Sequence, residues 1–136
     1  MASRARISVV NDTESFLSLI RDALEDRYTI STFNGEGLTT ERLVGSRPDL
    51  IMVDLVMRGR ELSGWDVIQL CRTEDQLCEV PIIVCSADSD QLRQRAADMA
   101  TIPSLTVLEK PFGLDELDAA VGAALEPPAT NGQAAG

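Results

Sequence analysis

Five polar residues stand at the ends of short apolar runs, and their side chains are of types that can do chemistry together. They are Asn11 and Asp12, Asp54, Ser86, and Lys110. In open α/β folds the carboxyl ends of parallel strands meet at one edge of the sheet, and ligands bind there. If each run is a strand, the sequence predicts a carboxylate pair, a hydroxyl and an ammonium group around one spot.

This set of groups favours phosphoryl chemistry on an aspartate. A carboxylate can act as a covalent nucleophile, also toward phosphorus. Asp12 and Asp54 together offer oxygens to a hard cation such as Mg²⁺, which bridges carboxylates and phosphoryl oxygens. Lys110 can stabilise the remaining charge, and the Ser86 hydroxyl can bond to a phosphoryl oxygen.

The composition indicates one acidic domain. A chain of 136 residues with 44% hydrophobic content can form a single core. Its net charge of −10 disfavours direct binding to nucleic acid, because phosphate contacts need clusters of Lys and Arg. No segment approaches the roughly 20 apolar residues of a membrane span, so we expect no membrane insertion. Residues 1–6 are not followed by an apolar h-region of the length that a signal peptide has, so we expect no signal peptide.

Cysteine and histidine usage narrows the chemistry further. Cys71, Cys78 and Cys85 form no C-x-x-C motif, and the chain has no histidine. A zinc site or a disulfide framework is therefore disfavoured, and we expect buried free thiols in a reducing cytoplasm. Without histidine, Ser-His-Asp catalysis is excluded, and any phosphohistidine must belong to another molecule.

Apolar runs alternate with segments of helical period along the chain, as in a doubly wound α/β fold with a parallel sheet. We predict strands at 7–10, 28–33, 50–54, 80–85 and 105–108. We predict helices at 13–25, 37–45, 65–72, 88–100 and 114–125. In the fourth helix, Leu92, Ala96 and Met99 are expected to face inward. Residues 126–136 are rich in Pro, Ala and Gly, which predicts a flexible tail.

Five motifs in order make the chain resemble a response-regulator receiver (CheY-like) domain of two-component signalling. They lie at residues 9–12, 48–55, 63–66, 81–87 and 109–112. The resemblance spans about residues 5–125. It implies a flavodoxin-like (βα)5 fold whose five parallel strands have the order 2-1-3-4-5.

The resemblance also implies a role for each site residue. Asp54 would accept a phosphoryl group from a histidine kinase or a histidine phosphotransfer protein. Mg²⁺ would be bound by Asp12, Asp54 and the Val56 carbonyl, with Asn11 acting in the outer sphere. Ser86, the Ala87 N–H and Lys110 would contact the phosphoryl group. The Lys110–Pro111 bond would be cis.

A downstream protein, or a second copy in a homodimer, would bind through the fourth helix, fifth strand and fifth helix. The domain would be no enzyme beyond its own phosphorylation and dephosphorylation.

The chain departs from the family pattern at four places. Asn11 stands where the family usually has an acidic residue, which predicts weakened Mg²⁺ binding. Val107 replaces a common aromatic switch residue. The apolar Val56 is expected to shield an acylphosphate from water. The stretch after Asp54 is longer than usual and carries residues 58–61, including two arginines that could steer an acidic partner or simply be solvated.

Three alternatives remain to be weighed. A degenerate receiver would act as a phosphorylation-independent scaffold, which Asn11 and Val107 favour. A phosphatase of the haloacid dehalogenase type would need an aspartate at Val56 and a cap domain. A flavodoxin-like flavin binder would need a phosphate loop less acidic than residues 11–14.

Overall fold

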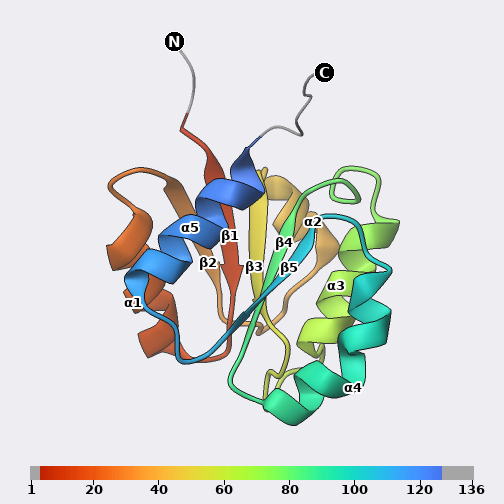
Figure 1. The fold of residues 1–136 in the computed structure, drawn as a ribbon. Coiled ribbons are helices and arrows are strands. Elements are labelled where there is room, and N and C mark those ends of the chain that lie inside the picture. The colour runs from red at the N-terminus through yellow and green to blue at the C-terminus, as the bar shows by residue number, and fades with distance from the viewer. Residues whose placement is uncertain (1–3, 127–136) are drawn as a thin grey trace, which may run out of the picture.

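The computed structural model describes residues 4–126, which form ten alternating strands and helices (Figure 1). The strands are β1 (Arg6–Val10), β2 (Thr29–Phe33), β3 (Leu50–Asp54), β4 (Ile82–Ser86) and β5 (Leu105–Glu109). The helices are α1 (Glu14–Leu24), α2 (Thr40–Gly45), α3 (Gly64–Thr73), α4 (Ser89–Ala100) and α5 (Leu114–Leu125). The predicted tail lies outside the described residues except for Glu126.

The five strands form one parallel sheet in the order β2-β1-β3-β4-β5, which confirms the predicted fold class. In this register Asp54 pairs with Cys85, and Ser86 pairs with Glu109. The carboxyl ends of β1, β3, β4 and β5 therefore meet at one edge, at the bottom of Figure 1.

Helices cover both faces of the sheet. One core packs α1 and α5 against the sheet through Leu17, Ile20 and Leu117. The other packs α2, α3 and α4 against the opposite face, and Ile68 is fully buried there. All residues of β3 and β4 are buried, which explains their continuous apolar runs. By contrast, β5 at the sheet edge is largely exposed.

Two predicted boundaries were wrong by more than one residue, and the others agree with the structure to within one residue. Helix α2 begins at Thr40, not at residue 37, because the Thr39 side chain caps it by accepting a hydrogen bond from the Arg42 N–H. Strand β4 begins at Ile82, because the Val80 N–H closes a turn onto the Leu77 carbonyl and proline has no N–H for the ladder.

One predicted core position was also wrong. Leu92 and Met99 are buried, but Ala96 is exposed and lines an open groove of about 490 Å³ between α4 and β5. Val107, 42% exposed, lies in the same groove. A short side chain on β5 thus leaves this side of α4 uncovered.

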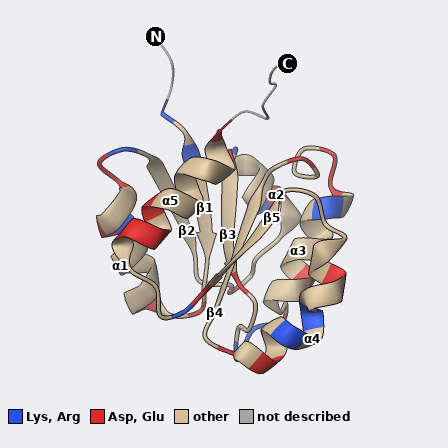
Figure 2. Ribbon diagram, in the orientation of Figure 1, with Lys and Arg blue, Asp and Glu red and all other residues tan. Residues whose placement is uncertain are grey.

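Charge is distributed over the surface in both signs. Figure 2 shows both signs on α4, which carries Asp90, Arg93, Arg95 and Asp98. Arg93 pairs with Asp90, and Arg95 pairs with Asp98 while lying over the Trp65 ring. No helix within residues 4–126 is both long and apolar enough to cross a bilayer.

Candidate functional site

Asp54, at the end of β3, is 8% exposed, and its carboxylate is held by three hydrogen-bond donors. Its Oδ2 accepts from Lys110 Nζ at 3.0 Å and from Asn11 Nδ2 at 3.1 Å. Its Oδ1 accepts from the Val56 N–H at 3.0 Å. The strand ends therefore bring Asp54, Lys110 and Asn11 together, as their positions in the sequence predicted.

The Asn11 amide has only one possible orientation in this arrangement. Its Oδ1 accepts a hydrogen bond from the Thr13 N–H at 2.8 Å, and a backbone N–H can only donate. The NH₂ group must therefore point the other way, toward Asp54. Asn11 is 1% exposed, so neither end of the amide is free to turn to solvent.

Asp12 lies at the mouth of the site and ties it to the loop after β3. Its Oδ2 accepts from the Arg58 N–H at 2.8 Å. Asp12, Asp54 and Val56 line one open cavity of about 230 Å³. Two carboxylates and a backbone segment thus border a space large enough for a small anion and its counter-ion.

The end of β4 supplies the other wall of this cavity. Ser86 is 1% exposed, and its Oγ accepts from the Asp88 N–H at 3.1 Å. The Asp88 side chain in turn caps α4 by accepting from the Gln91 N–H. Ala87 is exposed and lines the cavity. Asp88 was not among the predicted site residues, although Ser86 and Asp88 have the spacing of a side-chain turn.

Lys110 is positioned by contacts of both its backbone and its side chain. Its N–H donates to the Ser86 carbonyl at 2.8 Å, and the Lys110–Pro111 bond is cis. Its ammonium lies 4.0 Å from the centre of the Phe16 ring, a cation–π contact. Phe16 was not among the predicted site residues.

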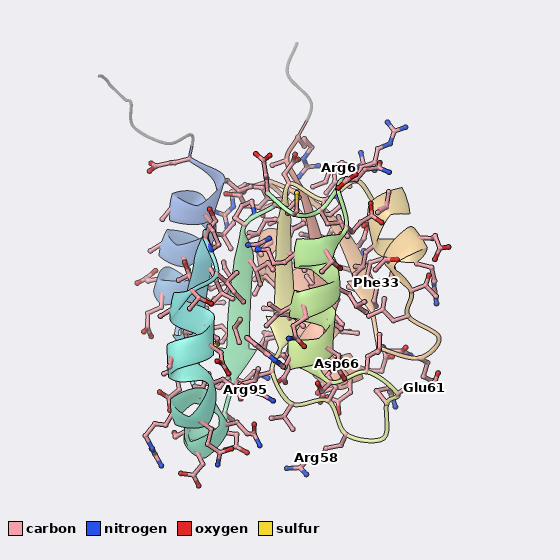
Figure 3. The ribbon with its side chains drawn as sticks, turned by 90° about the vertical axis from the view of Figure 1, so that its right-hand side faces the viewer. Arg6, Phe33, Arg58, Glu61, Asp66 and Arg95 are labelled. Carbon is pink, nitrogen blue, oxygen red and sulfur yellow. The ribbon has the colours of Figure 1, made fainter. Side chains whose placement is uncertain are left out.

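The two arginines of the long loop behave differently. Arg60 is structural, because its Nε donates to the Asn34 carbonyl at 2.7 Å and ties the loop to the segment after β2. Arg58 is exposed, and Figure 3 shows its side chain directed away from the sheet. It borders the cavity and an adjoining hollow lined by Ser89, Asp90 and Arg93.

The oxygen atoms at the site fit a hard divalent cation, although the protein supplies few of them. Within residues 4–126, no three His, Cys, Asp or Glu side chains gather closely enough to hold a metal ion. A cation in the cavity would rely on the Asp12 and Asp54 carboxylates and on a backbone oxygen such as that of Val56. Such oxygen ligands are the kind that Mg²⁺ prefers, with water completing its octahedron.

Cys85, whose thiol is buried, pairs in register with Asp54. Burial raises the pKa of this thiol to about 12, and the Asp54 charge adds to the rise while Lys110 opposes it. Cys85 is therefore protonated at neutral pH and is not a nucleophile. Asp54 and Asp12 are the carboxylates that the predicted phosphoryl and cation chemistry requires, and both line the cavity.

The strand order 2-1-3-4-5, with a cavity at the carboxyl edge of the sheet, defines a flavodoxin-like fold. Comparison with known families identifies the kind of domain, since the model of the response regulator receiver domain matches residues 7–122. The chain belongs to this family, whose members are modules of two-component signalling rather than conventional enzymes.

Individual proteins that resemble this chain are also response regulators. The polar-differentiation response regulator DivK of Brucella anthropi is 34% identical over 96 residues, covering 65% of this chain and 75% of DivK. The KDP operon transcriptional regulatory protein KdpE of Escherichia coli is 34% identical over 121 residues, but the match spans only 50% of KdpE. The chemotaxis response regulator CheY4 of Vibrio cholerae superposes with a TM-score of 0.78 at 19% identity, over 90% of this chain and all of that one.

Proposed function

We propose that this domain accepts a phosphoryl group on Asp54 from a phosphohistidine of a histidine kinase or a histidine phosphotransfer protein. The observation that carries the proposal is the Asp54 carboxylate, which opens onto a cavity beside Asp12 with Lys110 Nζ 3.0 Å away. Family membership supports it, because receiver domains are the phosphoacceptor modules of two-component systems.

The phosphoryl transfer forms one bond to phosphorus and breaks another. An Asp54 carboxylate oxygen attacks phosphorus, and the bond between phosphorus and the imidazole nitrogen breaks. The imidazole leaves with the bonding electron pair and takes up a proton from water. The product is an acylphosphate on Asp54 and a neutral histidine on the partner.

Neighbouring groups offset the charge of the phosphoryl oxygens. The Lys110 ammonium moves from Asp54 to these oxygens, and the Ser86 hydroxyl and Ala87 N–H donate to them. Mg²⁺, held by Asp12, Asp54 and the Val56 carbonyl, would supply further neutralisation. The ring of Phe16, 4.0 Å from the Lys110 ammonium, keeps this group near the cavity.

We infer that the new charge of about −1.5 to −2 changes a binding surface on α4, β5 and α5. The groove of about 490 Å³ between α4 and β5 supports this choice. Val107, which is 42% exposed, is one of the residues that line it. The occupant would be a downstream protein or a second copy of the domain.

The direct experiment is to incubate the protein with acetyl phosphate and Mg²⁺ and to measure its intact mass. We expect one phosphoryl adduct, which Asp54→Asn and an excess of EDTA should each abolish. Sedimentation of the same sample before and after phosphorylation tests the homodimer, and an unchanged mass would exclude it.

The second candidate function is that of a phosphorylation-independent scaffold, because the Asn11 amide already donates a hydrogen bond to the Asp54 carboxylate. The retained Asp12, Ser86 and Lys110 argue against it. The absence of an adduct from a folded sample, with phosphohistidine as well as acetyl phosphate as donor, would decide for the scaffold.

A further inference from the structure

The hydrogen bonds around Asp54 leave little of its carboxylate available. An ionised carboxylate has about four lone-pair sites, two on each oxygen. Lys110 and Asn11 take both sites of Oδ2, and the Val56 N–H takes one of Oδ1. A phosphoryl acceptor that also binds a cation needs two sites, one for phosphorus and one for the metal.

Of the three donors, Asn11 makes the weakest bond. The Lys110 contact is an ion pair, which makes its hydrogen bond stronger than a neutral one. The Val56 N–H belongs to the backbone immediately after Asp54. The Asn11 bond joins a neutral amide to the carboxylate at 3.1 Å, the longest of the three.

The direction of the amide also opposes a cation. The partly positive NH₂ group faces the carboxylate, and the oxygen is turned away to the Thr13 N–H. An outer-sphere role that uses the Asn11 oxygen would require this buried side chain to turn over and to leave the Thr13 N–H without its partner.

We propose that Asn11 is a positioning residue that competes with Mg²⁺ for Asp54. It holds the acceptor carboxylate in place in the cation-free protein and yields when Mg²⁺ binds. This inference builds on the proposed function, and it gives phosphorylation a cation threshold that an acidic residue at position 11 would not impose. It replaces the outer-sphere role predicted from the family pattern.

The proposal is tested by whether Asn11→Ala raises or lowers the dissociation constant for Mg²⁺. Backbone amide shifts followed by NMR during a Mg²⁺ titration, with no phosphodonor present, give the dissociation constant. Asn11→Ala should lower it by about three- to tenfold, since one hydrogen bond from a neutral donor no longer competes. Asn11→Asp should lower it by more than about tenfold, because it adds a charged ligand. An unchanged or raised constant for Asn11→Ala would overturn the proposal, and a raised one would point to the outer-sphere role.

The matched control is Ser8→Ala, which removes another buried polar side chain from β1. The Ser8 hydroxyl bonds to the Ser46 hydroxyl at 2.7 Å, away from the carboxyl edge. This variant should leave the Mg²⁺ dissociation constant within about twofold of the original value, the scatter allowed for independent sites.

A second measurement on the unaltered protein guards against an Asn11 variant that fails to fold. Saturating Mg²⁺ should speed the exchange of the Asn11 side-chain NH₂ protons with water, because the bond to Asp54 breaks. Unchanged exchange would contradict the proposal. Neither measurement involves phosphorylation, so tighter Mg²⁺ binding by Asn11→Ala together with no adduct on Asp54 would reject the proposed function but keep this inference.

Discussion

Val56 contacts the acceptor site with its backbone and borders it with its side chain. Its N–H donates to Asp54 Oδ1, and the residue lines the cavity. An isopropyl group there can neither orient nor activate a water molecule for attack on an acylphosphate. Val56→Asn should therefore speed dephosphorylation by about fivefold, the value of one added hydrogen bond of about 1 kcal/mol in the transition state.

The loss of the phosphoryl adduct with time, after removal of the donor, measures this rate by mass. Val107→Asn is the control, because this exposed valine lies in the groove between α4 and β5 and not in the site cavity. An unaltered rate in Val56→Asn would contradict the shielding role.

Gly64, the first residue of α3, shows how closely two elements approach each other at the site. Its N–H donates to the Leu55 carbonyl at 3.1 Å. An added Cβ would lie 1.9 Å from the Asp54 carbonyl oxygen and 2.6 Å from the Leu55 Cα. Both neighbours are backbone atoms and cannot turn aside, so Gly64→Ala should destabilise the fold by about 3 kcal/mol or more.

Denaturant unfolding measures this loss. Gly122→Ala is the matched control, since a Cβ at this position in α5 would meet nothing within 4 Å. It should stabilise the protein by about 0.5–1 kcal/mol through the better helix propensity of alanine. If both variants unfold at the same denaturant concentration, the close approach at Gly64 does not matter.

The stability of the whole molecule should fall in alkaline solution because two thiols are buried in the core. Burial raises the pKa of Cys71 from 9.0 to about 11, and that of Cys85 from 9.0 to about 12. Between pH 9 and pH 11 the unfolded chain loses these protons while the folded protein keeps them. The unfolded state then binds fewer protons, so the free energy of unfolding decreases as pH rises.

Urea unfolding at several pH values from 8 to 11 measures this slope. Cys85→Ala should flatten it, whereas Cys78→Ala, which removes a thiol that is only partly buried, should leave it unchanged. An identical slope in Cys85→Ala would show that other groups cause the alkaline loss.

The sequence by itself determined the alternation of strands and helices and the edge at which the chemistry lies. Continuous apolar runs such as residues 50–53 can be satisfied only in a sheet that is covered on both faces, and a polar residue directly after such a run has to emerge at its carboxyl end. These two local facts placed Asp54, Ser86 and Lys110 together, and the structure confirms that they meet.

Only the tertiary structure decided what those groups do to one another. The direction of the Asn11 amide depends on the Thr13 N–H and on Asp54, 43 positions away along the chain. The exposure of Ala96 depends on which side chain β5 presents to α4. The bond between Asn11 and Asp54 and the groove between α4 and β5 are each formed by two elements, and no residue pattern within a single element encodes them.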